Sequence, residues 1–174
     1  SKGNSPCGPP PVVRDLHSGE ERARVEINDS LEVSDLGTKI GRLFDLAGKK
    51  IASIHATWDP ESGAPVYTVD GIYSSRGWTE WTQGFQYGCA LLQFEASRDE
   101  RFLAIGREGT AERMVSHLTH IGVHDHGFNT ISSYGNLRRM IIEGALTDES
   151  GEHRFCELAI KVSGAVQASR WTRL

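Results

Sequence analysis

Residues 85–103 read FQYGCALLQFEASRDERFL, and this stretch predicts two helices joined by a very short connection. Apolar residues occupy several sides of the first segment, from Phe85 to Phe94, which is typical of a buried helix. Arg98 and Asp99 leave room only for a tight turn, and Asp99 is a residue type that caps the start of a helix. Two helices joined so closely pack as antiparallel neighbours, so the sequence predicts a helical hairpin here.

Helical periodicity continues on both sides of this hairpin. Apolar residues at three-, four- and seven-residue steps predict a long amphipathic helix from Leu31 to about Ile54. The helix capped by Asp99 is expected to continue to Leu118, and residues 59–77 are expected to form a loop. Two further helices are predicted by the apolar residues Leu137, Met140, Ile141 and Leu146 and by Phe155, Leu158, Ala159, Val162, Ala165 and Val166. No βαβ rhythm is visible, so we expect an all-α fold of successive helical hairpins.

The composition is that of an ordinary globular domain. The chain has 174 residues, of which 38% are hydrophobic and 24% charged, and its net charge is -4. No segment approaches the roughly 18 consecutive apolar residues that a membrane span requires, so no membrane partner is expected. The acidic balance argues mildly against a nucleic-acid partner, because nucleic-acid-binding domains normally carry a basic stripe.

The first 30 residues differ from the rest of the chain. They are polar, contain Pro9-Pro10-Pro11 and show no apolar period that lasts. This pattern predicts an N-terminal arm or linker over residues 1–30 and a folded domain over residues 31–174. No secretory signal opens the sequence, and both a cytoplasmic and a periplasmic location remain open.

The cysteines predict no cross-linked framework. There are three, Cys7, Cys89 and Cys156, and their wide spacing indicates neither a disulfide network nor a metal knuckle. Cys89 and Cys156 are expected to be small buried hydrophobic residues.

Two motifs carry side chains suited to sugar chemistry. The first is Trp81-Thr82-Gln83-Gly84-Phe85, and the second is His124-Asp125-His126-Gly127-Phe128. A tryptophan can stack on the apolar face of a sugar ring, and an aspartate can act in general acid–base catalysis. Sugar hydrolysis usually needs two carboxylates, and the motifs supply only Asp125. We therefore expect a sugar pocket whose second carboxylate lies elsewhere.

Together with Gly88, Leu91, Glu95 and residues 99–103, these motifs resemble the unsaturated glucuronyl hydrolases and the related unsaturated rhamnogalacturonyl hydrolases. The resemblance covers the chain from about residue 35 to its end. It implies a six-hairpin glycosidase, an (α/α)6 barrel with the sugar pocket at one end. Six hairpins require on the order of 200 residues, so residues 31–174 are expected to form roughly half of such a barrel, its N-terminal half.

The resemblance also implies roles for individual residues. Asp125 takes the place of the pocket aspartate, and His124 that of its neighbouring histidine. Trp81, or less favourably Trp78, is the aromatic residue near the sugar. The implied reaction hydrates the C4=C5 double bond of a terminal unsaturated uronic acid, with no cofactor and no metal. The implied partners are an unsaturated uronide oligosaccharide and a missing C-terminal half or second polypeptide, which would supply the acid–base aspartate expected beyond Trp171.

Plainer interpretations and other functions remain open. Asp125 could be a turn former, and a core position is preferred for Trp78. Arg138 and Arg139 could form a fork for a uronate carboxylate, but we expect them to lie on a solvated helix face. A non-catalytic carbohydrate-binding or structural helical module is one alternative function. Another is a metal-dependent hydrolase built on the histidine cluster at His117, His120, His124 and His126. The sequence lacks the H-E-x-x-H motif common in catalytic zinc sites.

Overall fold

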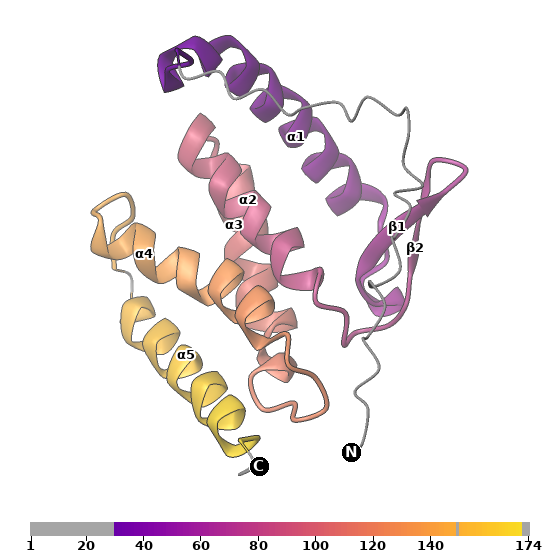
Figure 1. Ribbon diagram of the computed structural model, residues 1–174, viewed down its shortest axis with the longest axis vertical. Coiled ribbons are helices and arrows are strands. Elements are labelled where there is room, and N and C mark those ends of the chain that lie inside the picture. Colours follow the sequence, from indigo (N-terminus) through magenta and orange to yellow (C-terminus); the bar gives the residue numbers. More distant parts are fainter. Residues whose placement is uncertain (1–29, 149, 172–174) are drawn as a thin grey trace, which may run out of the picture. The chain divides into compact units, whose positions relative to one another are not determined.

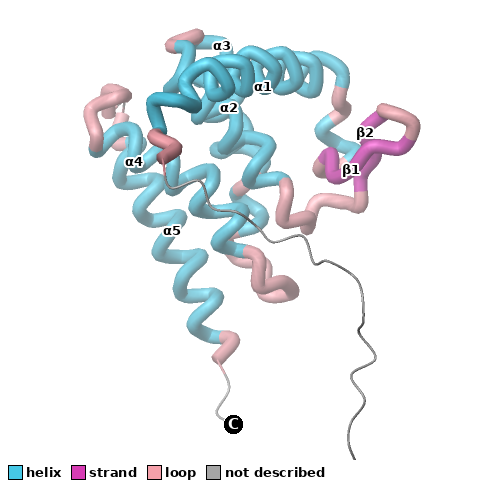
Figure 2. The backbone as a smooth tube through the Cα atoms, turned by 45° about the horizontal axis from the view of Figure 1, so that its top comes forward, coloured by secondary structure: helices cyan, strands magenta, loops and turns pink. Residues whose placement is uncertain are grey.

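The computed structural model describes residues 30–148 and 150–171, and the described residues from Leu36 onward form one compact unit. Except for Ser30, the predicted arm over residues 1–30, including Cys7, lies outside the described residues. The described part is mostly helical, with five α-helices and one small pair of strands (Figures 1 and 2). The α-helices are α1 (Gly37–Thr57), α2 (Gln83–Ser97), α3 (Glu100–Glu108), α4 (Asn136–Ile142) and α5 (Glu152–Ser169).

Shorter helical segments adjoin these helices. Two π-helices, η3 (Gly109–Arg113) and η5 (Gly127–Gly135), directly follow α3 and directly precede α4. Three 3₁₀ turns are η1 (Val33–Leu36), η2 (Pro60–Ser62) and η4 (Val115–His117).

The helical hairpin predicted between residues 85 and 103 is confirmed as α2 and α3. Arg98 ends α2 in the left-handed conformation, with a φ of 57°, and its N–H donates to the carbonyl oxygen of Phe94 at 2.7 Å. The Asp99 carboxylate accepts a hydrogen bond from the Arg101 backbone N–H at 3.0 Å. Asp99 is therefore the helix cap that the sequence predicted.

The expectation of an all-α fold is wrong between residues 65 and 75. Strands β1 (Pro65–Val69) and β2 (Ile72–Ser75) pair antiparallel in the segment expected to be a loop. Asp70 and Gly71 connect them with φ values of 51° and 80°. Asp-Gly is a preferred pair for a two-residue hairpin turn with two positive φ angles, so this dipeptide was the sequence signal.

Helix boundaries differ from the expectation in three places. The first long helix begins at Gly37 and not at Leu31. The helix capped by Asp99 ends its regular part at Glu108 and passes through η3 and η4 before Leu118. The fourth helix begins at Gly127, because η5 continues without a break into α4. Apolar spacing does not encode the change from an α to a π hydrogen-bond pattern.

The described helices do not close into a ring, so no barrel is seen in residues 30–148 and 150–171 (Figure 1). Within the same ranges, no helix is long and apolar enough to pass through a membrane.

The core lies between α2, α3, α5 and the helix formed by η5 and α4. Its buried members are Tyr87, Leu91, Phe94, Phe102, Leu103, Met114, Leu118, Tyr134, Leu137, Met140, Cys156 and Ala159. Most of these are apolar positions that the helical periodicity predicts. Cys156 is buried as expected, and burial raises the pKa of its thiol to about 12. Cys89 is exposed, so the expectation that it is buried is wrong.

Backbone contacts join α2 to η5. A Cβ atom added to Gly84 would lie 2.5 Å from the carbonyl oxygen of Phe128, and one added to Gly88 would overlap the carbonyl oxygen of Ser132. No side chain fits at either position without movement of the facing backbone. Because Gly84 faces residues 128–129 and Gly88 faces Ser132, the two helices run parallel.

Two ion pairs connect the helices at their surface. Arg139 of α4 donates to both carboxylate oxygens of Glu95 on α2, at 3.0 and 2.7 Å, and also bonds Glu143. The Arg139 hydrogen bond holds the pKa of Glu95 below its usual value. Arg107 of α3 donates to both oxygens of Glu152 at the start of α5. Arg139 is thus an interhelical link, which corrects the expectation of a solvated face.

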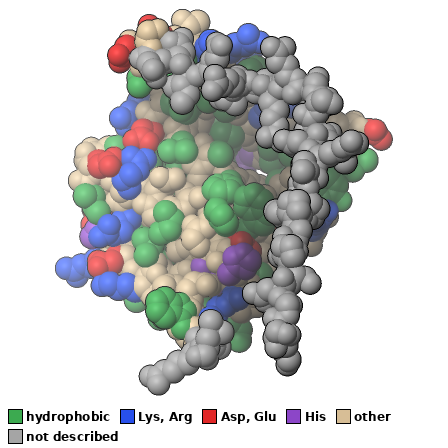
Figure 3. Space-filling view, in the orientation of Figure 1, with side chains coloured by type: hydrophobic (Ala, Val, Ile, Leu, Met, Phe, Trp, Pro, Cys, Tyr) green, Lys and Arg blue, Asp and Glu red, His purple; other side chains and the backbone are tan. Residues whose placement is uncertain are grey.

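Several helices also present apolar side chains to solvent. On α1 these are Ile40, Leu43 and Leu46, and on α5 they are Phe155 and Leu158. Figure 3 shows hydrophobic side chains gathered in the middle of one face, over α2 and the η5–α4 helix. Apolar side chains at the surface in this way are available for contact with another molecule.

The Gly84 contact predicts a strong effect of one added methyl group. Gly84→Ala should lower the free energy of unfolding by about 3 kcal/mol, since the facing backbone must move. Gly41→Ala is the matched control in α1, where no atom lies within 4 Å of an added Cβ. It should leave the free energy of unfolding unchanged or raise it by up to about 1 kcal/mol. Urea unfolding followed by circular dichroism measures both, and equal stabilities would contradict the packing described.

Candidate functional site

The structure brings the two motifs together. The N–H of Gly84, in the first motif, donates to the Asn129 side-chain oxygen at 2.9 Å, directly after the second motif. Gly84 is also the residue whose backbone packs closely against the backbone of residues 128–129. A buried hydrogen bond therefore holds the two motifs against each other.

His117 forms the centre of this junction. Because the Asn129 side-chain oxygen accepts from Gly84, its amide nitrogen faces His117 and donates to Nδ1 at 3.1 Å. Nδ1 is then the acceptor, so Nε2 carries the proton and donates to Oε1 of Gln83 at 2.6 Å. Burial, together with the nearby His120 and His126, lowers the pKa of His117 to about 4. His117 is therefore a neutral structural residue at neutral pH.

His126 anchors the second motif to α5. Its Nε2 donates to the carbonyl oxygen of His120 at 2.5 Å, so Nδ1 accepts from the Ser163 hydroxyl at 2.8 Å. Ser163 can in turn accept from the hydroxyl of Thr130 at 3.0 Å. All three side chains are buried. This chain of hydrogen bonds fixes the start of η5 against the last helix.

The histidine cluster does not assemble as a metal site in the described part of the chain. No group of three or more His, Cys, Asp or Glu side chains there is placed to hold a metal ion. Both ring nitrogens of His117 and of His126 already make hydrogen bonds within the protein. Either residue could ligate a metal only by breaking these bonds.

Trp81 joins two phenylalanines in an aromatic patch, defined here as Trp81, Phe85 and Phe128. The Trp81 ring centroid lies 5.6 Å from that of Phe85 and 5.4 Å from that of Phe128, and the two phenylalanine centroids are 5.8 Å apart. All three rings are partly exposed to solvent. The patch therefore combines both motifs in one apolar surface that a sugar ring could cover.

Asp125 lies next to the patch in sequence and next to His124 in space. His124 Nε2 is 3.4 Å from a carboxylate oxygen of Asp125, and the two side chains are 84% and 19% exposed. The Asp125 carbonyl oxygen accepts from Asn129 N at 3.2 Å, so Asp125 stands at the start of η5, three residues before Phe128. Asp125 therefore lies in the same helical turn as Phe128, whose ring contacts Trp81.

Trp78 lies apart from the aromatic patch. Its ring makes edge contacts with His117 and His120, at centroid distances of 5.5 and 5.1 Å. The residue is 47% exposed, so the preferred interpretation of Trp78 as a core residue is wrong.

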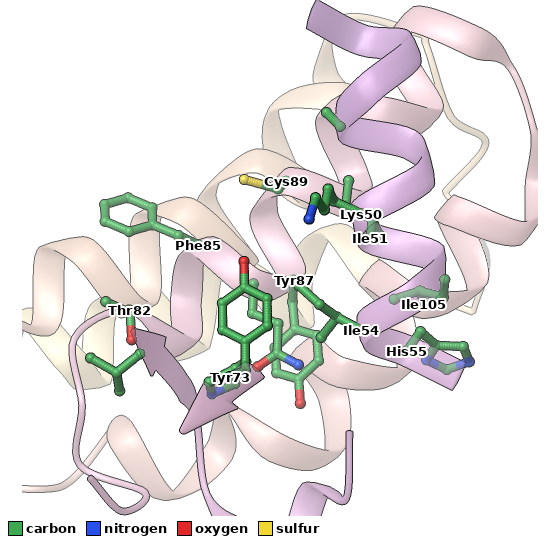
Figure 4. A pocket seen from close by; sticks show the side chains of 14 residues that line it. Lys50, Ile51, Ile54, His55, Tyr73, Thr82, Phe85, Tyr87, Cys89 and Ile105 are labelled. Atoms are coloured by element: carbon green, nitrogen blue, oxygen red, sulfur yellow. The ribbon is translucent and has the colours of Figure 1, made fainter. Parts of the chain in front are cut away.

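An apolar cavity that the sequence did not indicate adjoins the aromatic patch. It has a volume of about 360 Å³ and lies between α1, the strands and α2 (Figure 4). Ile51 and Ile54 line it from α1, Tyr73 lines it from β2, and Phe85 lines it from α2. Phe85 belongs to both the cavity and the patch, so the two adjoin at this residue.

Sequence reasoning missed the residues that hold the site in place. Gln83, His117 and Asn129 form the junction, and Ser163 anchors the second motif from α5. Gln83 lies inside the first motif and Asn129 directly after the second. These positions were the one indication in the sequence that the two residues could help to join the motifs. Nothing in the sequence pointed to Ser163.

Comparisons with protein-family models, with curated proteins and with solved structures found no match to this chain. The functional interpretation rests on the two motifs and on their arrangement.

The low pKa of His117 predicts a loss of stability in acid. The unfolded chain binds a proton at this residue near pH 6.5, whereas the folded chain binds it only near pH 4. The stabilisation that neutral His117 provides is fully present above pH 6.5, the pKa of the unfolded chain, and is lost as the pH falls from there towards pH 4. Between about pH 7.5 and about pH 4.5 it should contribute about 2 kcal/mol to the fall in the free energy of unfolding.

His117→Gln should remove this part of the pH dependence, which urea unfolding at the two pH values would measure. His55→Gln is the control, because His55 is exposed on α1. The assignment fails if the His117→Gln protein loses as much stability on acidification as the unsubstituted protein.

Proposed function

We propose that this chain forms part of the sugar-binding site of a glycoside hydrolase of the unsaturated uronyl hydrolase type. The observation that carries the proposal is the aromatic patch, in which Trp81 of the first motif meets Phe128 of the second, one helical turn from Asp125. An apolar ring surface beside a carboxylate is the usual composition of a sugar pocket.

In this proposal the chain binds and orients the terminal unsaturated uronic acid. Trp81 covers the apolar face of the ring, and Asp125 with His124 hydrogen-bonds the ring beside the C4=C5 double bond. An acid protonates the double bond at one carbon, and water adds at the other to give a hemiketal. Collapse of the hemiketal releases the next sugar. The acid requires a second carboxyl group with a raised pKa, and Asp125 alone does not supply the pair.

The second carboxyl group belongs, in this proposal, to the remainder of an (α/α)6 barrel. Support comes from the apolar residues that α1 and α5 expose, which further helices would cover. Those helices come from more of the same polypeptide or from a second chain.

A carbohydrate-binding module is the second candidate. It is favoured by the pairing of an exposed aromatic patch with a single carboxylate, since binding needs no acid–base pair. Turnover distinguishes the two candidates.

Asp125→Asn should abolish turnover in the natural polypeptide that carries this chain. Turnover is followed as the loss of the ultraviolet absorbance of the C4=C5 double bond of an unsaturated glucuronyl disaccharide. Helical circular dichroism should be unchanged, because the amide keeps the shape of the carboxylate. Asp45→Asn, at an exposed position of α1, is the matched control and should retain full activity. Full activity of Asp125→Asn would refute the assignment of Asp125, and a fully inert unsubstituted polypeptide that binds the sugar would favour the module.

Trp81→Ala should weaken binding of the same disaccharide by about tenfold, a loss of roughly 1.4 kcal/mol from stacking. Trp81→Phe keeps an aromatic face and should recover most of the affinity. The measurement is KM in the active polypeptide, or Kd by calorimetry if it does not turn over. An unchanged affinity in Trp81→Ala would mean that the tryptophan serves only to pack against Phe85 and Phe128.

A further inference from the structure

The apolar cavity between α1, the strands and α2 has no role in the proposed reaction. Its volume of about 360 Å³ falls within the range of small-molecule sites. A methylene group occupies about as much space as a water molecule, roughly 30 Å³, so the cavity has room for a chain of about ten carbons. Aliphatic and aromatic side chains from α1, both strands, α2 and α3 form most of its wall (Figure 4).

Contacts on either side of the cavity hold α1 in place. A Cβ added to Gly48 would lie 3.1 Å from Nε2 of Gln93 on α2 and 3.3 Å from a ring carbon of Phe102 on α3. Directly after α1, the indole N–H of Trp58 donates to the carbonyl oxygen of Gly63 at 2.8 Å. Most of the α1 residues that line the cavity lie between these two points. The wall is therefore fixed before any ligand binds, which lowers the entropic cost of binding.

Three polar groups of the wall have no partner within the described residues. The ammonium group of Lys50 forms no ion pair with any of these residues, and the hydroxyl of Tyr73 forms no hydrogen bond with them. The hydroxyl oxygen of Thr82 is buried and also lacks a hydrogen-bond partner in the same part of the chain. All three groups can donate, so a ligand that offers acceptor atoms could bond to them without first breaking a bond within the protein.

The charge of the wall selects an anionic head group. Lys50 is positive, and no carboxylate side chain is among the described residues that line the cavity. In Figure 4 the hydroxyl of Tyr73 is directed toward the side of the cavity where Lys50 lies. A carboxylate there can bond to both groups, whereas an ammonium group would be repelled by Lys50.

The apolar remainder of the wall selects the body of the ligand. A ring with many hydroxyl groups would lose its hydrogen bonds to water without gaining enough partners. An alkyl chain loses no hydrogen bonds and gains from the removal of its surface from water. The wall thus fits a molecule with an apolar chain and one anionic end.

We propose that the apolar cavity binds a medium-chain alkyl carboxylate. The chain lies against the aliphatic side chains of α1, and the carboxylate bonds to Lys50 and Tyr73 at one end. This site is independent of the proposed function, because neither Asp125 nor Trp81 lines the cavity.

Calorimetric titration of the natural polypeptide that carries this chain tests the site with four probes: octanoate, butanoate, octan-1-ol and octylammonium. Each buried methylene group should strengthen binding by roughly three- to fourfold, so octanoate should bind about 100-fold more tightly than butanoate. Octylammonium should bind at least about tenfold more weakly than octanoate, because its charge has the same sign as that of Lys50.

Two substitutions test the head group. Lys50→Met keeps an apolar stem but removes the charge, so it should weaken octanoate binding by about tenfold and leave octan-1-ol binding unchanged. Tyr73→Phe should weaken octanoate binding by about threefold. Lys49→Met is the matched control, because Lys49 is exposed on α1 and does not line the cavity. It should leave the affinity for octanoate unchanged.

Two further measurements locate the ligand. Ala47→Phe should fill the cavity and abolish binding of octanoate and octan-1-ol, with an unchanged helical circular dichroism. In the unsubstituted protein, Cys89 lines the cavity and reports on its occupancy. Octanoate should slow the alkylation of Cys89 by iodoacetamide about fivefold, whereas butanoate at the same concentration should not. Peptide mass spectrometry distinguishes Cys89 from Cys7 and Cys156.

Several results would overturn the site. Equal affinities for octanoate and octylammonium, or an unchanged affinity for octanoate in Lys50→Met, would refute the anionic head group. Octanoate binding that is lost in Trp81→Ala but kept in Ala47→Phe would place the ligand on the aromatic patch. A natural polypeptide that does not bind octanoate has no such site. None of these results bears on sugar turnover, which the Asp125→Asn measurement tests separately.

Discussion

The close contact between α2 and η5 is the constraint on which the rest of the structure depends. Gly84 and Gly88 present backbone to the backbone of residues 128–132, and no other residue type fits there without movement. This approach lets the amide of Gly84 reach the side chain of Asn129, which in turn fixes His117. The close packing of the two backbones therefore fixes the position of two motifs that are far apart in the sequence.

Helices with a clear apolar period or a local cap could be predicted, whereas contacts between residues far apart in the sequence could not. Asp99 caps α3 as expected, because a cap depends on neighbours in sequence. The strands around Asp70 were missed since a short Asp-Gly hairpin has few periodic residues, although that dipeptide was a signal. Cys89 is of a residue type that is usually buried, but it lies on an exposed side of α2. The sequence alone does not show which side of this helix faces solvent. Arg139 was assigned to solvent because its partner, Glu95, is 44 residues away.

The sequence pointed to the two motifs of the candidate site but not to the contacts that hold them together. Trp81 and the second motif were singled out for their chemistry, and the structure brings Trp81 to Phe128. The sequence did not show that His117 and His126 are buried and that both ring nitrogens of each form hydrogen bonds within the protein. A histidine looks the same in a sequence whether it binds a ligand or holds a helix in place. The difference lies in its burial and its partners, which only the fold determines.

The parallel run of α2 and η5 has an electrostatic consequence. Parallel helices place their N-terminal ends together, and each end carries roughly half a positive elementary charge from its aligned peptide dipoles. Antiparallel neighbours would largely cancel these fields, but here the two add at the end where the motifs lie. Asp125 occupies that end, and its negative charge is of the favoured sign. The backbone alone thus makes this end of the helix pair attractive to a carboxylate.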